Sequence, residues 1–112
     1  MIGSVEIIFY TTKNGRQPFV TWLRRLDAKS KTVINARIAR IRGGNFGDCK
    51  QIKGVLGLWE FRINYGPGFR IYFGKKGAKV IVLLVGGEKG SQKRDIMRAR
   101  FYWCECEKLV YE

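Results

Sequence analysis

Two short segments of alternating apolar and polar residues, separated by a glycine–proline–glycine turn, constrain the fold of this chain more than any other feature. Residues 58–64 (LWEFRIN) and 69–73 (FRIYF) each have the alternation of a half-buried β-strand. Their apolar side chains share a core face only if even-numbered positions pair with each other, which requires a loop with an odd number of residues. A five-residue loop, 65–69, meets this condition, because the GPG residues 66–68 supply the unusual backbone angles it needs.

The predicted hairpin gathers polar groups on the face opposite its apolar residues. One pairing places Arg62 opposite Tyr72 and Asn64 opposite Arg70, with Glu60 on the same face. An antiparallel sheet often has one solvated face on which arginine is common. The alternation alone therefore fits either an ordinary charged surface or a site that holds a phosphate.

The remaining segments predict an α+β fold. The run KVIVLLV (79–85) is almost wholly apolar, as expected of a strand that is covered on both faces. Because 112 residues suit one core, we expect one domain over 1–112, in which an N-terminal strand and a helical hairpin pack on an antiparallel sheet. The other expected elements are a strand over 5–10, helices over 18–26 and 32–42 with capping side chains at 27–30 and a stop at Gly43–Gly44, a polar connection over 45–57, and a final helix from Ser91.

Charge indicates a polyanionic partner, since 22 Lys and Arg against 9 Asp and Glu give a formal net charge of +13. No window approaches the roughly 18 to 20 apolar residues of a membrane span, and the first ten residues lack the pattern of a signal peptide. We therefore expect a cytoplasmic protein without membrane contact. Three cysteines and no histidine disfavour both a disulfide framework and a four-ligand zinc site, so we expect no metal and no cofactor.

The motifs of the second half of the chain resemble the addiction-module killer proteins of the RelE/ParE toxin superfamily, in the branch called HigB-like or phage Gp49-like. Members show an E-hydrophobic-R strand, a GPG-aromatic-R-hydrophobic-aromatic hairpin, and an apolar strand that runs into GG-acidic-K-x-x-Q and Asp-Ile. The segment NARIARI followed by GNFGDCK is also similar to the family. The matching residues are Glu60, Arg62, Gly66, Pro67, Gly68, Phe69, Arg70, Tyr72, Gly86, Gly87, Glu88, Lys89, Gln92, Asp95 and Ile96.

This resemblance implies a RelE-like fold and the toxin half of a type II toxin–antitoxin pair. Many such relatives are mRNA interferases that cut mRNA on the ribosome, whereas ParE-like relatives inhibit DNA gyrase, and the fold does not choose between them. The implied partners are a cognate antitoxin, expected to be a helix-turn-helix protein, together with mRNA and the ribosome. Operator DNA would be reached only through the antitoxin. A third possibility is a non-toxic nucleic-acid-binding module.

Metal-independent RNA cleavage needs a base for the 2′-OH, an acid for the leaving 5′-oxygen, and cations for the charge on phosphate. Arg62 and Arg70 are the expected phosphate-binding cations, since guanidinium binds phosphate through two parallel hydrogen bonds. Lys89, where the family places a cationic residue, is a candidate acid or base. Glu60 is either a base or the ion-pair partner of Arg62, and Tyr72 either donates a proton, stacks on a base, or packs across the strands.

The sequence suggests supporting roles for several further residues. Lys75 and Lys76 are predicted in a turn, where they would attract RNA nonspecifically, and Gln92 is a candidate substrate contact. Asp95 is expected to favour the start of the last helix. Two alternatives stay open: Gly86 and Gly87 either let a ligand approach or simply end a strand, and the aromatic residues near the C-terminus, Tyr102, Trp103 and Tyr111, either stack on a base or close the core.

Overall fold

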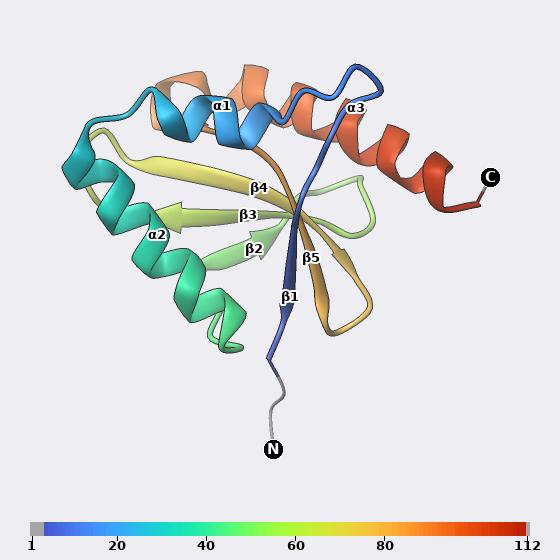
Figure 1. The fold of residues 1–112 in the computed structure, drawn as a ribbon, viewed down its shortest axis with the longest axis horizontal. Coiled ribbons are helices and arrows are strands. Elements are labelled where there is room, and N and C mark those ends of the chain that lie inside the picture. Colours follow the sequence, from blue (N-terminus) through green and yellow to red (C-terminus); the bar gives the residue numbers. More distant parts are fainter. Residues whose placement is uncertain (1–3, 112) are drawn as a thin grey trace.

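A computed structural model describes residues 4–111, with side chains as far as Glu107, so the side chain of Tyr111 lies outside the described residues (Figure 1). The chain forms an α+β fold in which one five-stranded sheet carries three α-helices, counted over the described residues. In chain order the elements are β1 (Glu6–Phe9), α1 (Pro18–Arg24), α2 (Ala28–Arg42), β2 (Cys49–Gln51), β3 (Leu58–Ile63), β4 (Phe69–Lys76), β5 (Val80–Glu88), the short 3-10 helix η1 (Lys89–Ser91) and α3 (Gln92–Tyr111).

The sheet is mixed, and this corrects the expectation of an antiparallel one. The strand order is β1-β5-β4-β3-β2, and β1 pairs in parallel with β5, whereas every other pairing is antiparallel. The direction of β1 follows from the helical hairpin, which carries the chain from β1 at one edge of the sheet to β2 at the other edge. The residues of β1 alone do not reveal this direction. The edge strand β2 was also missed, because its three residues are largely exposed and show no alternation.

The register of the central hairpin differs from the predicted one by two residues. Arg62 pairs with Arg70 and Glu60 pairs with Tyr72, so the five-residue loop is 64–68 and not 65–69. The prediction that even-numbered residues of the two strands pair with each other is confirmed. The loop begins one residue earlier because the Gly68 amide donates to the Tyr65 carbonyl at 3.0 Å, with Gly68 itself at a positive φ of 80°.

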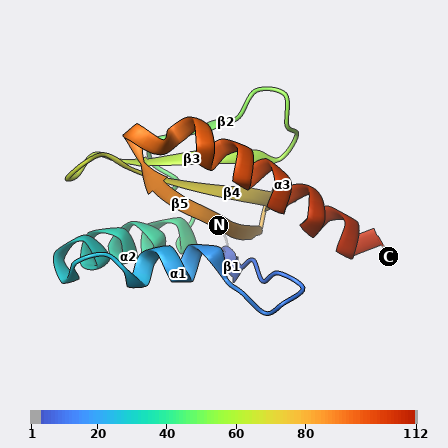
Figure 2. The same ribbon diagram turned by 90° about the horizontal axis from the view of Figure 1, so that it is seen from above.

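Helices cover both faces of the sheet, and Figure 2 shows α1 and α2 on one side and α3 on the other. β5 is buried on both faces, as its apolar run predicts: Ile81 and Leu83 pack toward α1 and α2, whereas Val82, Leu84 and Val85 pack toward α3. The face that the hairpin's polar residues share is therefore covered by α3 and is not an open solvated face.

A capping side chain sets the start of α2, and a glycine follows its end. The Asp27 carboxylate accepts a hydrogen bond from the Ser30 amide at 3.1 Å, as predicted, and α2 ends at Gly43. Because this cap acts at residue 27, α2 starts at Ala28, four residues before the expected start. Within the described residues, no helix is both long enough and apolar enough to cross a bilayer.

Two glycines let helices approach the sheet closely. A Cβ added at Gly74 of β4 would lie 2.2 Å from the Trp103 ring of α3, and one at Gly86 of β5 would lie 2.2 Å from the Trp22 ring of α1. Trp103 is 3% exposed, and its indole N–H donates to the Leu56 carbonyl at 3.0 Å. Trp103 therefore closes the core, which decides between the two roles that the sequence left open for it.

Replacing Gly74 by alanine should destabilise the protein by about 1–3 kcal/mol, because the added methyl group has no space beside the Trp103 ring. Gly90→Ala is the matched control, since a Cβ there meets nothing within 4 Å, and it should stay within about 0.5 kcal/mol of the wild type. Urea unfolding measures both changes. Equal stability of the two variants would contradict the close packing of α3 on β4.

Candidate functional site

Glu60, in the middle of β3, is the centre of a polar network beneath the start of α3. Its side chain is fully buried. One carboxylate oxygen accepts from Arg62 Nε at 2.9 Å, and the other accepts from Gln92 Nε2 at 2.6 Å. These two bonds connect the sheet to the first residue of α3, and they occupy both oxygens of the carboxylate.

The network keeps Glu60 ionised and Tyr72 protonated. Burial opposes the ionisation of Glu60, but hydrogen bonds from Arg62 and Gln92 outweigh it and hold the pKa of this carboxyl below its ordinary value. Tyr72 lies opposite Glu60 and is fully buried, and burial together with the charges of Glu60 and Asp95 raises the pKa of its hydroxyl far above the ordinary value. At neutral pH Tyr72 therefore keeps its proton and is neither a base nor a ready proton donor.

Arg62 and Arg70 are cross-strand neighbours beside this network. The Arg62 side chain is 35% exposed and reaches solvent beyond its bond to Glu60. Arg70 Nη1 donates to the Gly68 carbonyl at 3.0 Å, and its buried Nε has no hydrogen-bond partner among the described residues. Arg62 and Arg70 thus form an arginine pair in the backbone register at the loop end of the hairpin, with the Arg62 side chain turned toward Glu60 and the Arg70 side chain turned toward Gly68.

Lys89 joins this end of the hairpin through its backbone. Its amide donates to the Gly68 carbonyl at 2.9 Å, the same oxygen that accepts from Arg70. The lysine is exposed in η1, directly after β5. The structure therefore brings together six of the predicted site residues: Glu60, Arg62, Arg70, Tyr72, Lys89 and Gln92.

Lys75 and Lys76 lie elsewhere. They belong to β4 and not to a turn, which corrects that expectation, and at about 3.3 Å per residue they lie roughly 15–20 Å along the strand from Arg70. Lys75 Nζ stands 4.7 Å from the ring centres of both Phe46 and Trp59, and Lys76 Nζ stands 5.9 Å from that of Trp103. Cation–π contacts hold both lysines at the opposite end of the hairpin from the arginine pair.

The glycines at the end of β5 do not end the strand, because β5 continues through them to Glu88. Side chains of this chain occupy the positions that a Cβ would take on these two residues. Gly86 accommodates the Trp22 ring. Gly87, opposite Arg70, accommodates the carboxylate of Asp95, which is 1% exposed and accepts a short hydrogen bond from Ser91.

The sequence did not indicate a site role for Ser91, and it predicted only that Asp95 favours the start of the last helix. The available signal was the spacing of the two residues, because positions i and i+4 on a helix face one another.

Comparison with known proteins places this network inside a recognised family region. Residues 21–100 match the family model described as "Phage derived protein Gp49-like (DUF891)". A Haemophilus influenzae protein, described as an uncharacterized protein, is 41% identical over 83 residues, which covers 73% of this chain and 82% of the relative. The matched region contains all six clustered residues.

Replacing Glu60 by glutamine should cost about 1–3 kcal/mol of stability at pH 7, because Arg62 loses its charged acceptor. Since the native pKa of Glu60 is lowered, its contribution is present above the ordinary value of about 4.3 and is lost as the pH falls through the native value. The difference in unfolding free energy between wild type and Glu60→Gln should therefore narrow below about pH 4.

The control for this prediction is Glu6→Gln, an exposed carboxylate on β1. It should change stability little at any pH. A difference between wild type and Glu60→Gln that stays constant from pH 7 to pH 3 would show that the Glu60 carboxylate is not held in its ionised form by the network.

Proposed function

Because this chain belongs to the Gp49-like family of phage-derived proteins, a family of addiction-module toxins, we propose that it is the toxin of a type II toxin–antitoxin pair and an endoribonuclease that cuts mRNA on the ribosome. The pairing of β1 with β5 and the helical hairpin between β1 and β2 support a single RelE-like domain over the whole chain. The observation that carries the enzymatic proposal is the position of Arg62 beside Arg70, with Lys89 bonded to the same loop.

Arg62 and Arg70 bind the scissile phosphate in this proposal. Both are delocalised cations at the end of the sheet, and the buried Nε of Arg70 still lacks a hydrogen-bond acceptor within the described residues. Fixed cations of this kind stabilise the charge that grows on phosphate as the 2′-oxygen attacks it. Glycine at position 68 is required, since a Cβ there would lie 2.9 Å from Arg70 Nη1.

Lys89 is the proposed proton carrier. It is exposed and lies beside Arg70, so it can reach a bound RNA backbone. Glu60 is a poor base in this arrangement because both its oxygens accept hydrogen bonds. Its proposed role is to hold Arg62, with Gln92, in the orientation that phosphate binding needs. Tyr72, which stays protonated, lies opposite Glu60 on β4 and packs across the strands in this proposal.

The proposed partners follow from the family and the charge. The family supports an antitoxin, here proposed to be a helix-turn-helix protein through which alone the toxin would reach operator DNA. The net charge of +13 supports a polyanion such as ribosome-bound mRNA. Lys75 and Lys76, far from the arginine pair, would add nonspecific attraction to RNA.

Arg70→Ala should lower the rate of mRNA cleavage by about 10²–10³-fold, since loss of one cation or donor at a developing negative charge has this effect in other enzymes. We would incubate purified protein with one defined mRNA in a reconstituted translation system and map new 5′ ends by primer extension, with stalled ribosomes and without. The matched control is Arg40→Ala, an exposed arginine on α2, which should cleave like the wild type.

Arg70→Lys separates charge from geometry, because lysine keeps the cation but loses the fork that binds phosphate through two bonds. It should recover only a small part of the lost rate. Intact mRNA in the presence of folded wild-type protein that still arrests growth would reject the endoribonuclease proposal. Inhibition of DNA gyrase would then become the leading function.

A further inference from the structure

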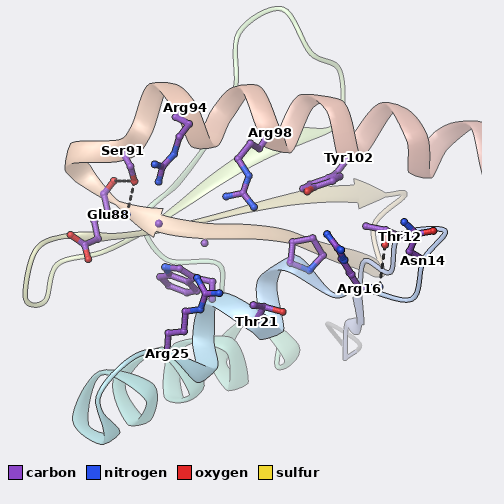
Figure 3. Close-up of a pocket in the computed structure, with 14 residues that line it drawn as sticks. Thr12, Asn14, Arg16, Thr21, Arg25, Glu88, Ser91, Arg94, Arg98 and Tyr102 are labelled. Atoms are coloured by element: carbon purple, nitrogen blue, oxygen red, sulfur yellow. Dashed lines mark hydrogen bonds between the residues drawn. The ribbon is translucent and has the colours of Figure 1, made fainter.

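A trough lined by arginines lies on the side of β5 that faces away from the hairpin. Figure 3 shows α1 and α3 as its two walls and β5 as its floor, and its volume is about 690 Å³. β1 pairs with β5 only as far as Leu83, so the described chain provides no strand beside the last residues of β5. The trough occupies that position and ends at the loop between β1 and α1.

Both walls are whole helix faces. One wall includes Ser91, the last residue of η1, followed by Arg94, Arg98 and Tyr102 of α3, at intervals of three or four positions. The same spacing relates Trp22 to Arg25 and to the start of α1. Each helix therefore presents one continuous side to the trough, and the surface is not formed by scattered residues.

Positive charge dominates the trough. Four arginines line it, against the single acidic lining residue Glu88: Arg25 at the C-cap of α1, Arg94 and Arg98 on α3, and Arg16 on the loop. All four arginines are exposed, and the Arg98 side chain is 43% exposed. The guanidinium groups thus stand on three sides of one volume and are open to an anionic ligand.

A carboxylate of this chain already contacts two of these arginines. One oxygen of the buried Asp95 lies 3.6 Å from Arg94 Nε and 3.6 Å from Arg98 Nη1, too long for close hydrogen bonds. That oxygen has no hydrogen-bond partner among the described residues. Asp95 therefore holds the two guanidinium groups from below, while their solvent-facing N–H groups stay available for a second carboxylate.

The aromatic residues of the trough favour a peptide over a single nucleic-acid strand. The Trp22 ring packs on Gly86 and meets Phe69 edge-on at 5.8 Å, and the Tyr102 ring contacts Tyr10 at 5.1 Å. Single-strand sites usually hold bases by stacking on aromatic rings. The rings here already pack against other residues of this chain. Arginine binds a carboxylate through two parallel hydrogen bonds and needs no aromatic ring for this contact.

We propose that this trough binds an extended acidic segment of a protein partner, with its carboxylates paired to Arg25 on one wall and Arg98 on the other. From Ser91 to Tyr102, α3 spans about 16 Å, which corresponds to about five residues of extended chain. The proposal that this segment belongs to the antitoxin rests on the proposed function, because the antitoxin is the partner that the family supports. The binding of an acidic segment in the trough does not depend on it. The trough and the arginine pair of the hairpin are separate surfaces.

The test measures the binding of a labelled six-residue peptide of alternating Glu and Val by fluorescence anisotropy. A Gln-for-Glu peptide and a labelled six-nucleotide RNA serve as comparison ligands. Arg98→Glu and Arg25→Glu should each weaken binding of the acidic peptide at least tenfold. Arg100→Glu, an equal charge change at an exposed position of α3 outside the trough, should weaken it less than threefold. Amide NMR signals of Gly86 to Glu88 should shift when the acidic peptide binds.

Three results would overturn the proposal. The first is that Arg98→Glu and Arg100→Glu weaken binding of the acidic peptide equally. The second is that the Glu and Gln peptides bind equally well. The third is that Arg98→Glu selectively loses RNA binding, which would make the trough a nucleic-acid site.

Arg70→Ala separates this proposal from the enzymatic one, because it should lose cleavage and still bind the peptide. Arg98→Glu should lose the peptide and cleave mRNA like Arg100→Glu.

Discussion

The buried carboxylate of Glu60 is the constraint on which the rest of this structure depends. A charge beneath a helix is costly unless hydrogen bonds satisfy it, and here Arg62 and Gln92 do so. Those bonds fix the first residue of α3 on the sheet and turn Arg62 toward Glu60. Burial and the same charge together keep the neighbouring Tyr72 protonated. One ionised group thus determines how α3 meets the sheet and how the Arg62 side chain is turned.

β5 separates two basic surfaces that depend on the same glycine pair. Gly87 stands opposite Arg70 in the sheet and makes room for Asp95, whose other oxygen contacts Arg94 and Arg98 in the trough. Asp95 also raises the pKa of Tyr72. A substitution at Gly87 would therefore disturb the network around Glu60 and the trough together, whereas a change at Arg25 acts on the trough alone.

The sequence predicted those features that local pattern determines. Alternation revealed β3 and β4 and the parity of their pairing, and the continuous apolar run revealed that β5 is buried on both faces. It could not show the parallel pairing of β1 or the exact register at Arg62 and Arg70, because these depend on tertiary contacts. The sequence also could not show that α3 covers Glu60 or that four arginines line one trough. These residues come from segments that only the fold brings together.

The position of the scissile phosphate tests this account most directly. We would determine the structure of the protein on a ribosome whose mRNA carries a 2′-O-methyl group at the proposed cleavage position, so that the 2′-oxygen cannot attack. The account predicts that the phosphate lies within hydrogen-bond distance of Arg62 and Arg70, with Lys89 beside it and the Glu60 bonds intact. A phosphate held instead by Arg94 and Arg98 in the trough, away from the hairpin, would contradict it.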